Sequence, residues 1–346
     1  MAFNTVTFLF LFLPIAVVLY YIIEKTLRKP KIIIQNIILL ILSLVFFAWA
    51  DINCIYQLLA IIAWNYCCGI ACIKWKKSAI IGIIGNVVLF IYLKILPTLF
   101  GYINDLSDCN IQMYRIIVPI GFSFILFHCI SYLMDIYNGK SSPSKNIIDI
   151  ALYITFFPKL VQGPIVKYYD FEKSLHERTV NLKSFASGLE RFVIGLGKKV
   201  LIADALSETV NMIFAYSTSG IDTATAWLGS ILFTIQIYLD FSGYSDMAIG
   251  LCRIFGFDVK ENFDNPYFSK SVSEFWRRWH ISLGAWFREY LYIPLGGSRK
   301  GNVYFNLLVV SLLQASGMAQ QFLSSYGDLH TEYASFQRNT SQGTTC

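Results

Sequence analysis

Residues 266–299 read PYFSKSVSEFWRRWHISLGAWFREYLYIPLGGSR, and they follow an apolar segment, 224–250, that carries two aspartates. A stretch of about 20 predominantly apolar residues has the length of a transmembrane helix. The sequence after it concentrates a histidine, several arginines and many aromatic side chains. Polar groups placed beside a membrane span are expensive and mark functional sites. This part of the chain therefore predicts both a membrane fold and the position of a site.

The composition of the whole chain supports the membrane assignment. It is 55% hydrophobic and only 14% charged, whereas soluble domains carry about 25% charged residues. At about 20 residues per span, there is room for about eight to ten transmembrane or re-entrant helices. We therefore predict an all-α, polytopic integral membrane protein whose first partner is the lipid bilayer. The chain has no basic soluble domain, so a nucleic-acid partner is not expected.

Apolar runs predict the first five spans, at residues 7–23, 32–48, 54–73, 80–100 and 114–137. The fifth contains Pro119 and Gly121, which a span tolerates where neighbouring helices satisfy the freed backbone groups. Basic connections, at 24–31, 74–77 and 139–145, alternate with connections that lack bases. Lys and Arg mark cytoplasmic loops, so we expect the N-terminus on the outer side of the cell membrane. The first run lacks a basic n-region and a cleavage site, which predicts a retained span.

Residues 146–222 follow a different pattern. Their apolar stretches, 147–160 and 192–210, are short and are interrupted by FFPKLVQGPIVKYYDFEK and by the glycines and lysines of 195–199. Short segments interrupted by Gly and Pro at membrane depth predict re-entrant or interfacial helices that line a cavity. Since no internal repeat or linker is apparent, we expect a single membrane domain.

Asp240 and Asp246 lie inside the predicted span 224–250. On a helix the two side chains are about 120° apart, so both can face a protein interior. A carboxylate at membrane depth costs about 3 kcal/mol on insertion scales and is normally paired or functional. Two interpretations stay open: each aspartate pairs with an Arg or Tyr and holds helices together, or the aspartates take part in chemistry.

His280 closes the sequence WRRWH and is the leading candidate for chemistry. On a continuous helix, Trp276 and His280 would share one face. A histidine can accept a proton from a hydroxyl near neutral pH, and the arginines around it can hold phosphate groups. The alternative is an interfacial helix with a belt of tryptophans and arginines that extend into the headgroup region.

The remaining histidines and cysteines give weaker signals. His128 lies mid-span, where an interhelical hydrogen bond is the expected role, and His176 lies in a charged loop. Cys67, Cys68 and Cys72 have no histidine or carboxylate beside them, so we interpret them as packing residues and expect no metal site. Motifs of hydrolase elbows, P-loops and zinc proteases are absent from the sequence.

Several stretches together resemble the membrane-bound O-acyltransferase family, in its alginate O-acetyltransferase membrane-subunit branch: 119–139, 153–171, 239–301 and the NLLVV of 306–310. The resemblance covers essentially residues 1–313. The sequence LYIPLGG at 291–297 favours the branch that acetylates polysaccharides over the similar branch that transfers D-alanine to teichoic acid.

The resemblance implies a fold of many helices around a tunnel. An acyl group from a cytoplasmic thioester, such as acetyl-CoA, would cross it towards an extracellular polysaccharide, with no bound cofactor. An outer-face acetyl-acceptor or secretion protein is the implied protein partner. His280 matches the family's histidine on the arginine-rich cytoplasmic helix. The residues expected to bind donor or shape the tunnel are Arg277, Arg278, Lys270, Tyr244, Asp246, Asp240 and Trp279.

The family's principal histidine belongs to a Trp-His-Gly motif in the next span, and the 346 residues contain no such motif. The apolar run 304–313 stops after half a span and is followed by residues rich in Ser, Thr and Gln. One choice of codons from Leu313 onward, regrouped one base earlier, reads TGIWHGATVSFIIWGFAHGI, a span that carries the motif.

We therefore hypothesise that one base was lost in the Leu313 codon. Residues 1–313 would then form an incomplete family domain, and 314–346 an out-of-frame, disordered tail in which His330 has no role. We expect this chain to be inactive and poorly stable, with Asp240 and Asp246 left unpaired. Two alternatives stay open: a truncated, non-catalytic scaffold that binds secretion partners, and an ion-coupled transporter, which predicts an inverted repeat that the sequence lacks.

Overall fold

A computed structural model describes residues 2–26, 31–107, 117–215, 220–298 and 302–311. Within these ranges the regular secondary structure is helical throughout, which confirms the predicted all-α class. The chain divides into two compact units, Met1–Gly284 and Ala285–Cys346. The predicted tail, 314–346, lies outside the described residues.

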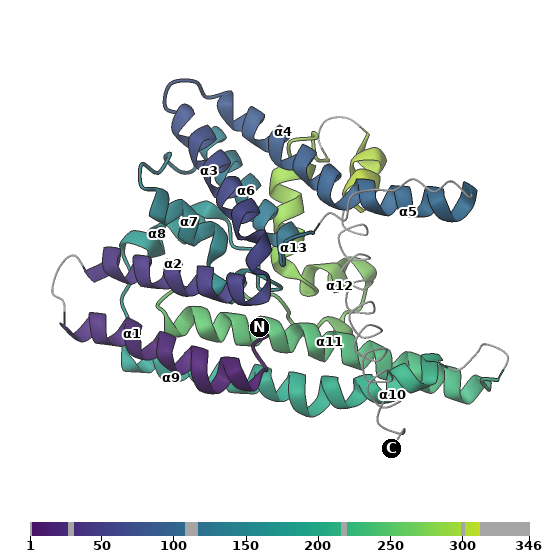
Figure 1. Ribbon diagram of the computed structural model, residues 1–346. Coiled ribbons are helices and arrows are strands. Elements are labelled where there is room, and N and C mark those ends of the chain that lie inside the picture. Colours follow the sequence, from purple (N-terminus) through teal and green to yellow (C-terminus); the bar gives the residue numbers. More distant parts are fainter. Residues whose placement is uncertain (1, 27–30, 108–116, 216–219, 299–301, 312–346) are drawn as a thin grey trace, which may run out of the picture. The chain divides into compact units, whose positions relative to one another are not determined.

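Five segments of the first unit are long and apolar enough to cross a membrane (Figure 1). They are η1 and α1 (Phe8–Phe12, Leu13–Thr26), α2 (Lys31–Ala50), η2 and α3 (Ile52–Cys54, Ile55–Ala71), α4, η3 and the start of α5 (Ser78–Phe90, Ile91–Ile95, Leu96–Ser107), and α11 (Thr223–Ile254). Each coincides closely with a span predicted from the sequence. The multi-pass membrane prediction is therefore confirmed.

The other helices are shorter or less apolar. They are α6 (Phe122–Tyr137), α7 (Ile147–Thr155), η4 (Phe157–Lys159), α8 (Tyr168–His176), α9 (Leu182–Gly197), η5 (Lys198–Ala203), α10 (Asp204–Ala215), η6 (Pro266–Phe268), α12 (Val272–Arg278), α13 (Ile281–Phe287) and η7 (Arg288–Tyr292). α7 and η4 occupy the short apolar stretch 147–160, and side chains such as Leu152, Phe156 and Phe157 are fully buried there. The break in the helix between α7 and η4 is therefore enclosed by protein. Non-helical backbone inside a membrane is tolerated only where protein or a cavity surrounds it.

The fifth predicted span was wrong at its N-terminal end. Helix α6 begins only at Phe122, so Pro119 and Gly121 precede the helix instead of lying within it. Gly121 adopts a left-handed conformation with φ of 68°, so the chain turns there before α6 begins. A Cβ on Gly121 would lie 2.3 Å from the carbonyl oxygen of Leu160, so the entry to α6 packs directly on that loop. Residues 114–116 of the predicted span lie outside the described residues.

The predicted interruption of the segment 192–210 at its glycines was also wrong. Helix α9, the π-helical η5 and helix α10 follow one another without interruption from Leu182 to Ala215. Gly195 and Gly197 therefore lie inside a helix and make no turn. Gly195, one of the two, instead lies in the close contact of α9 with α11, whereas Gly197 has only the Leu201 side chain near it.

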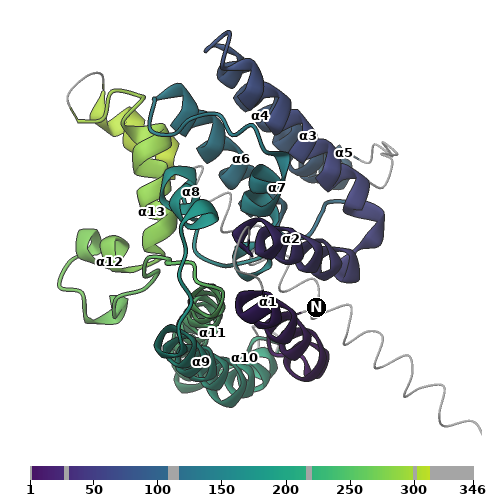
Figure 2. The same ribbon diagram turned by 90° about the vertical axis from the view of Figure 1, so that its left-hand side faces the viewer.

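Helix α9 runs beside α11 in both views (Figures 1 and 2). A Cβ at Gly195 would lie 2.6 Å from the carbonyl oxygen of Gly243, and a Cβ at Gly250 would lie 2.5 Å from that of Gly188. Because Gly188 meets Gly250 and Gly195 meets Gly243, the two helices are antiparallel. Small residues at such interfaces let helix backbones approach closely in a membrane.

We predict that Gly195→Ala destabilises the protein by about 1–3 kcal/mol, because the added methyl group must displace the backbone of α11. Gly197→Ala is the matched control, since its Cβ would meet only the Leu201 side chain, at 4.0 Å. Alanine there should be neutral or stabilising by up to about 1 kcal/mol through helix propensity. Thermal unfolding of the purified protein in detergent measures both effects. Equal unfolding midpoints for the two variants would contradict the close packing of α9 on α11.

Helices α1 and α11 end at the same side of the first unit. The hydroxyl of Tyr20 donates to the carbonyl oxygen of Phe255 at 2.8 Å, and that of Tyr21 donates to Ile254 at 2.9 Å. Helix α1 leads into the basic stretch 24–31, whereas residues 255–265 after α11 contain one lysine and three acidic residues. The two hydrogen bonds tie α1 to the C-terminal end of α11.

Candidate active site

His280 lies at a break between two short helices and not on a continuous one. Helix α12 ends at Arg278, Trp279 is extended, and His280 has a left-handed φ of 45°. The expectation that Trp276 and His280 share a helical face was therefore wrong. Two backbone hydrogen bonds hold the chain in this break by pairing it with the segment 262–264. Asp264 N–H donates to the carbonyl oxygen of Arg278, and Ile281 N–H donates to the carbonyl oxygen of Asn262.

The side chain of Asn262 fixes the tautomer of His280. Its Oδ1 accepts from the Ser282 backbone N–H at 3.2 Å, and because that group can only donate, Oδ1 must be the oxygen. The same oxygen accepts from Ser282 Oγ at 2.8 Å and lies 3.0 Å from His280 Nδ1, so Nδ1 must carry a proton. The amide Nδ2 donates to Ser245 Oγ at 3.0 Å. Within the described residues, His280 Nε2 is left with its lone pair and no hydrogen-bond partner.

The surroundings of His280 keep the imidazole neutral. Its side chain is only 4% exposed, and it contacts the ring of Phe241 edge-on and stacks on Phe263, with centroids 4.8 and 6.4 Å away. Burial lowers the pKa of His280 to about 3, because the charged form loses its hydration. A neutral imidazole with a free Nε2 can accept a proton or a hydrogen bond from a bound hydroxyl.

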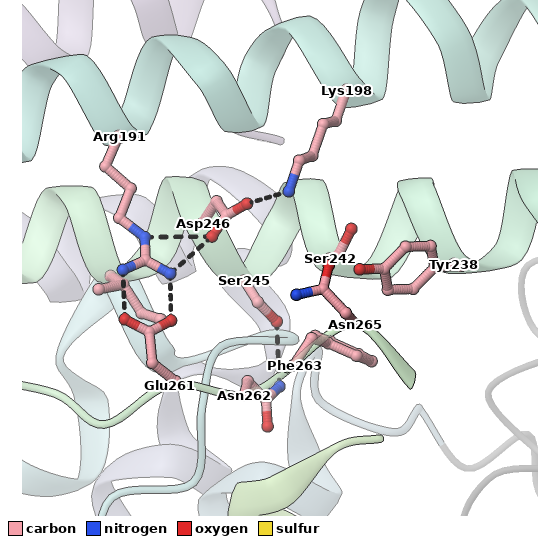
Figure 3. A pocket seen from close by; sticks show the side chains of 11 residues that line it. Arg191, Lys198, Tyr238, Ser242, Ser245, Asp246, Glu261, Asn262, Phe263 and Asn265 are labelled. Atoms are coloured by element: carbon pink, nitrogen blue, oxygen red, sulfur yellow. Dashed lines mark hydrogen bonds and ion pairs between the residues drawn. The ribbon is translucent and has the colours of Figure 1, made fainter. Parts of the chain in front are cut away.

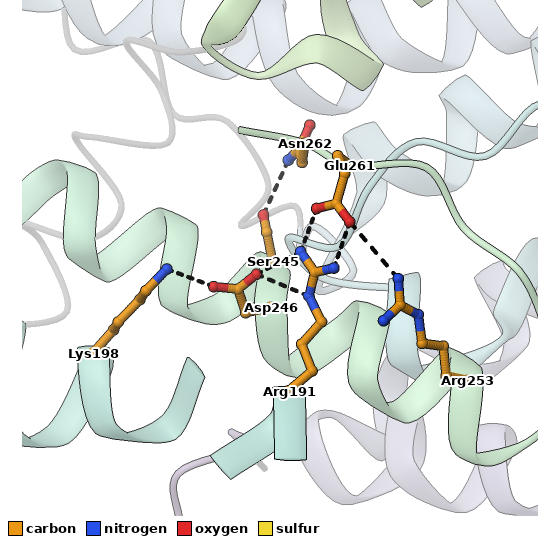
Figure 4. A network of polar contacts seen from close by, with 7 residues as sticks. All are labelled: Arg191, Lys198, Ser245, Asp246, Arg253, Glu261 and Asn262. Atoms are coloured by element: carbon orange, nitrogen blue, oxygen red, sulfur yellow. Dashed lines mark hydrogen bonds and ion pairs between the residues drawn. The ribbon is translucent and has the colours of Figure 1, made fainter. Parts of the chain in front are cut away.

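Ion pairs join α9, α11 and the segment after α11 (Figure 4). Asp246 accepts from Arg191 Nη2 at 2.8 Å and from Lys198 Nζ at 2.7 Å. Arg191 also makes a two-bond contact with Glu261, and Arg253 reaches Glu261 at 3.8 Å. These residues alternate in charge from Arg253 to Lys198. Because Asn262 follows Glu261 in the chain, the network also holds the segment that carries the partner of His280.

Asp240 has a separate set of partners. Lys199 Nζ lies 2.6 Å from Asp240 and 2.7 Å from Asp204. Lys198 and Lys199 are adjacent in sequence, and yet both reach carboxylates of α11. Both lysines belong to the π-helical η5. The expectation that Asp240 and Asp246 are unpaired in this chain was therefore wrong. Of the two interpretations that the sequence left open, the observed contacts favour pairing that holds helices together.

A cavity of about 150 Å³ lies beside this network (Figure 3). Its lining is Arg191, Lys198, Tyr238, Ser242, Ser245, Asp246, Ile249, Glu261, Asn262, Phe263 and Asn265. Asn262 and Phe263 thus contact His280 and also line the cavity. The cavity and the histidine are neighbours that share one wall.

The other predicted site residues do not line this cavity. Arg277 and Lys270 are exposed, and Arg278 pairs with Glu274 on its own helix at 2.7 Å. Trp279 is buried, with its ring stacked on Phe275 at 5.5 Å. Tyr244 stacks on Phe3 at 4.7 Å. The structure therefore brings together Asp246 and His280 through Ser245 and Asn262, and places the remaining candidates outside the cavity.

Three weaker signals can also be placed. Both ring nitrogens of His128 are buried without a hydrogen-bond partner, so the expected interhelical hydrogen bond is not observed, and the ring instead contacts Tyr153 edge-on at 5.4 Å. His176 is largely exposed and lies 3.8 Å from Asp149. Among the described residues no group of His, Cys, Asp and Glu could hold a metal ion.

Sequence reasoning missed Arg191, Lys198 and Asn262. A signal for the first two exists in the helical spacing of α9, where Gly188, Arg191, Gly195 and Lys198 form one stripe. The matching stripe on α11 is Gly243, Asp246, Gly250 and Arg253. Two stripes of glycines, with Arg191 and Lys198 on one helix and Asp246 on the other, predict a close, ion-paired helix contact. Asn262 has no such signal, because a loop asparagine shows its role only once its neighbours are placed.

The fold and site define a multi-pass helical membrane protein with a buried, neutral histidine beside a polar cavity. The family model of the membrane-bound O-acyltransferases matches residues 123–315, and the chain belongs to this family. The resemblance found in the sequence is thereby confirmed.

Named bacterial relatives support the branch. The chain is 39% identical to a Pseudomonas putida protein named probable alginate O-acetylase AlgI, over 90% of the chain and 65% of that protein. It is 33% identical to a Helicobacter pylori peptidoglycan O-acetyltransferase, over 90% of the chain and 65% of that protein. Similarity to a Bacillus subtilis teichoic acid D-alanyltransferase is lower, at 29% over 52% of the chain and 46% of that protein. The chain thus spans slightly less than two thirds of the length of the first two relatives.

Proposed function

We propose that this protein provides the donor side of an O-acyltransferase, which moves an acetyl or related acyl group from a cytoplasmic thioester to a hydroxyl of an extracellular polysaccharide. The observation that carries the proposal is His280, buried and held by Asn262 with its Nε2 lone pair free. Support for the reaction class comes from the family and from relatives named as acetylases of alginate and peptidoglycan.

The proposed chemistry places His280 on the donor side of the transfer, where its free Nε2 can accept a hydrogen bond. As the acceptor oxygen attacks the thioester carbonyl, its proton passes to the family's Trp-His-Gly histidine as general base, the new C–O bond forms, and the C–S bond breaks. The departing sulfur takes up the proton, so the histidine returns to its neutral form. Asn262 keeps Nδ1 of His280 protonated throughout and thereby keeps Nε2 in the accepting state.

The family's Trp-His-Gly histidine is absent from these 346 residues. We propose that transfer to the acceptor requires it, so that this chain alone does not complete the reaction. The expected outer-face protein and the polysaccharide would meet the acyl group at that second histidine. Ion-coupled transport receives no support, because Asp240 and Asp246 are both held in ion pairs.

The experiment compares two gene products in membranes: the 346-residue chain, and the product of a gene with one base restored in the Leu313 codon. We expect acetyl transfer from labelled acetyl-CoA to polysaccharide with the second and at least about a hundredfold less with the first, since a missing catalytic base costs 10²–10⁴-fold. Ordinary turnover by the 346-residue chain would refute its inactivity. Absence of transfer by both products, with either acetyl-CoA or acylated carrier protein as donor, would refute the acyltransferase proposal.

A further inference from the structure

The cavity beside the ion-pair network contains polar groups that the protein itself does not satisfy. Ser242 Oγ is buried without a hydrogen-bond partner, and the residue is 3% exposed. Among the described residues, no hydrogen bond reaches the hydroxyl of the half-buried Tyr238 or the amide of the exposed Asn265, and Figure 3 shows both beside Ser242. A buried hydroxyl without a hydrogen bond costs about 1–3 kcal/mol, so such groups normally face a water or a ligand.

The chemistry of these groups favours an anion. Lys198 lines the same cavity, and its ammonium gives one hydrogen bond to Asp246 and keeps further protons available. The carboxylates in the lining, Asp246 and Glu261, are already occupied by Arg191. What remains for a ligand is an ammonium, two hydroxyls and an amide, which together form a set of hydrogen-bond donors.

The charges around the cavity are close to balanced. Arg191, Lys198 and Arg253 bring three positive charges to the two carboxylates Asp246 and Glu261. The nearby ion pairs of Lys199 with Asp240 and Asp204 carry the opposite excess, but none of these three residues lines the cavity. The charged residues that line the cavity, two positive and two negative, balance one another, and Arg253 contacts Glu261 from outside the lining. A bound anion would therefore be held by the unused hydrogen-bond donors and not by a net positive charge of the lining.

We infer that this cavity binds a phosphate-class oxyanion through Lys198, Ser242, Tyr238 and Asn265. If the proposed function holds, the anion is a phosphate of the acyl donor. It would lie in the cavity that is also lined by Asn262, the hydrogen-bond partner of His280. The sequence assigned donor phosphates to Arg277, Arg278 and Lys270, which lie outside the cavity. A cavity of about 150 Å³ accommodates a single phosphate group with its hydrogen-bonded oxygens.

The test measures binding by the purified 346-residue protein in nanodiscs of uncharged lipid. The probes are inorganic phosphate, adenosine 3′,5′-diphosphate and short-chain phosphatidylglycerol, with the dissociation constant obtained by calorimetry. Saturable binding of at least one probe is expected. Binding of the nucleotide assigns the site to a soluble donor, binding of the phosphatidylglycerol alone assigns it to a lipid headgroup, and binding of inorganic phosphate alone assigns it to a free anion. No saturable binding of any probe overturns the inference.

Two variants locate the site. Ser242→Ala is expected to weaken binding about three- to tenfold while the unliganded protein unfolds at the same or a higher temperature, because an unsatisfied hydroxyl has been removed. Lys198→Gln should weaken binding at least about tenfold, and Asp246 keeps Arg191 as its partner. Lys199→Gln is the matched control and should bind like the wild type.

Unchanged binding in both Ser242→Ala and Lys198→Gln would overturn the inference. An equal loss of binding in Lys199→Gln would also overturn it, since the effect would then be one of general charge. Ser242→Ala decides the question even if Lys198→Gln fails to fold. Since binding requires no turnover, failure of this inference is distinguishable from failure of the acyl-transfer proposal.

Discussion

Replacing Arg191 with leucine is expected to lower the free energy of unfolding by about 2–4 kcal/mol. Arg191 is the residue that joins Asp246 of α11 to Glu261, and the Asp246 side chain is only 14% exposed. Removing one partner of a buried pair leaves a charge without compensation, which costs about 3–5 kcal/mol. The expected loss is smaller here, because Lys198 stays 2.7 Å from Asp246.

Arg253→Leu is the matched control for Arg191→Leu. Both arginines contact Glu261 (Figure 4), but Arg253 does so at 3.8 Å with both side chains a third or more exposed. Exposed ion pairs contribute about 0–1 kcal/mol, so Arg253→Leu should change stability by less than that. Chemical denaturation in detergent measures both variants. Equal losses of stability would show that the Arg191 network does not hold α9 against α11.

The class of fold was predictable because the bilayer imposes length and hydrophobicity on every span. The segments at 32–48 and 224–250 were located from those two properties, and the structure has helices Lys31–Ala50 and Thr223–Ile254 there. Where glycine or proline interrupts a run, sequence gives two options, a turn or a close contact. Gly121 makes a turn with φ of 68°, whereas Gly195 makes a contact with Gly243. The choice depends on the neighbouring helix, which one sequence does not display.

The site was predictable only in part, for a related reason. His280 was found because a histidine can accept a proton near neutral pH and because the family resemblance matched it to a family histidine. Its free Nε2 depends on Asn262, a loop residue whose carboxamide is oriented by the backbone of Ser282. Arg277 and Lys270 were chosen for their charge, but charge does not fix direction, and both side chains are exposed. The lysine that does line the cavity, Lys198, lies outside the stretches that carried the family resemblance.

His280→Ala is the second variant with a large expected effect. In the product of the base-restored gene it should lower acetyl transfer by about 10²–10⁴-fold, the usual contribution of a positioned acid or base. Because burial holds the pKa of His280 near 3, the unliganded imidazole is neutral across about pH 5–8. Its protonation should therefore produce no loss of transfer in that range. His176→Ala is the matched control, since that histidine is largely exposed on α8.

The most direct test of the account is acetyl transfer to polysaccharide by the base-restored protein, measured for the wild type, His280→Ala and His176→Ala at equal membrane content. We predict full transfer for the wild type and His176→Ala, and a loss of at least about a hundredfold for His280→Ala. Transfer by His280→Ala at the wild-type rate would contradict the central claim that the buried, Asn262-oriented histidine acts in the reaction.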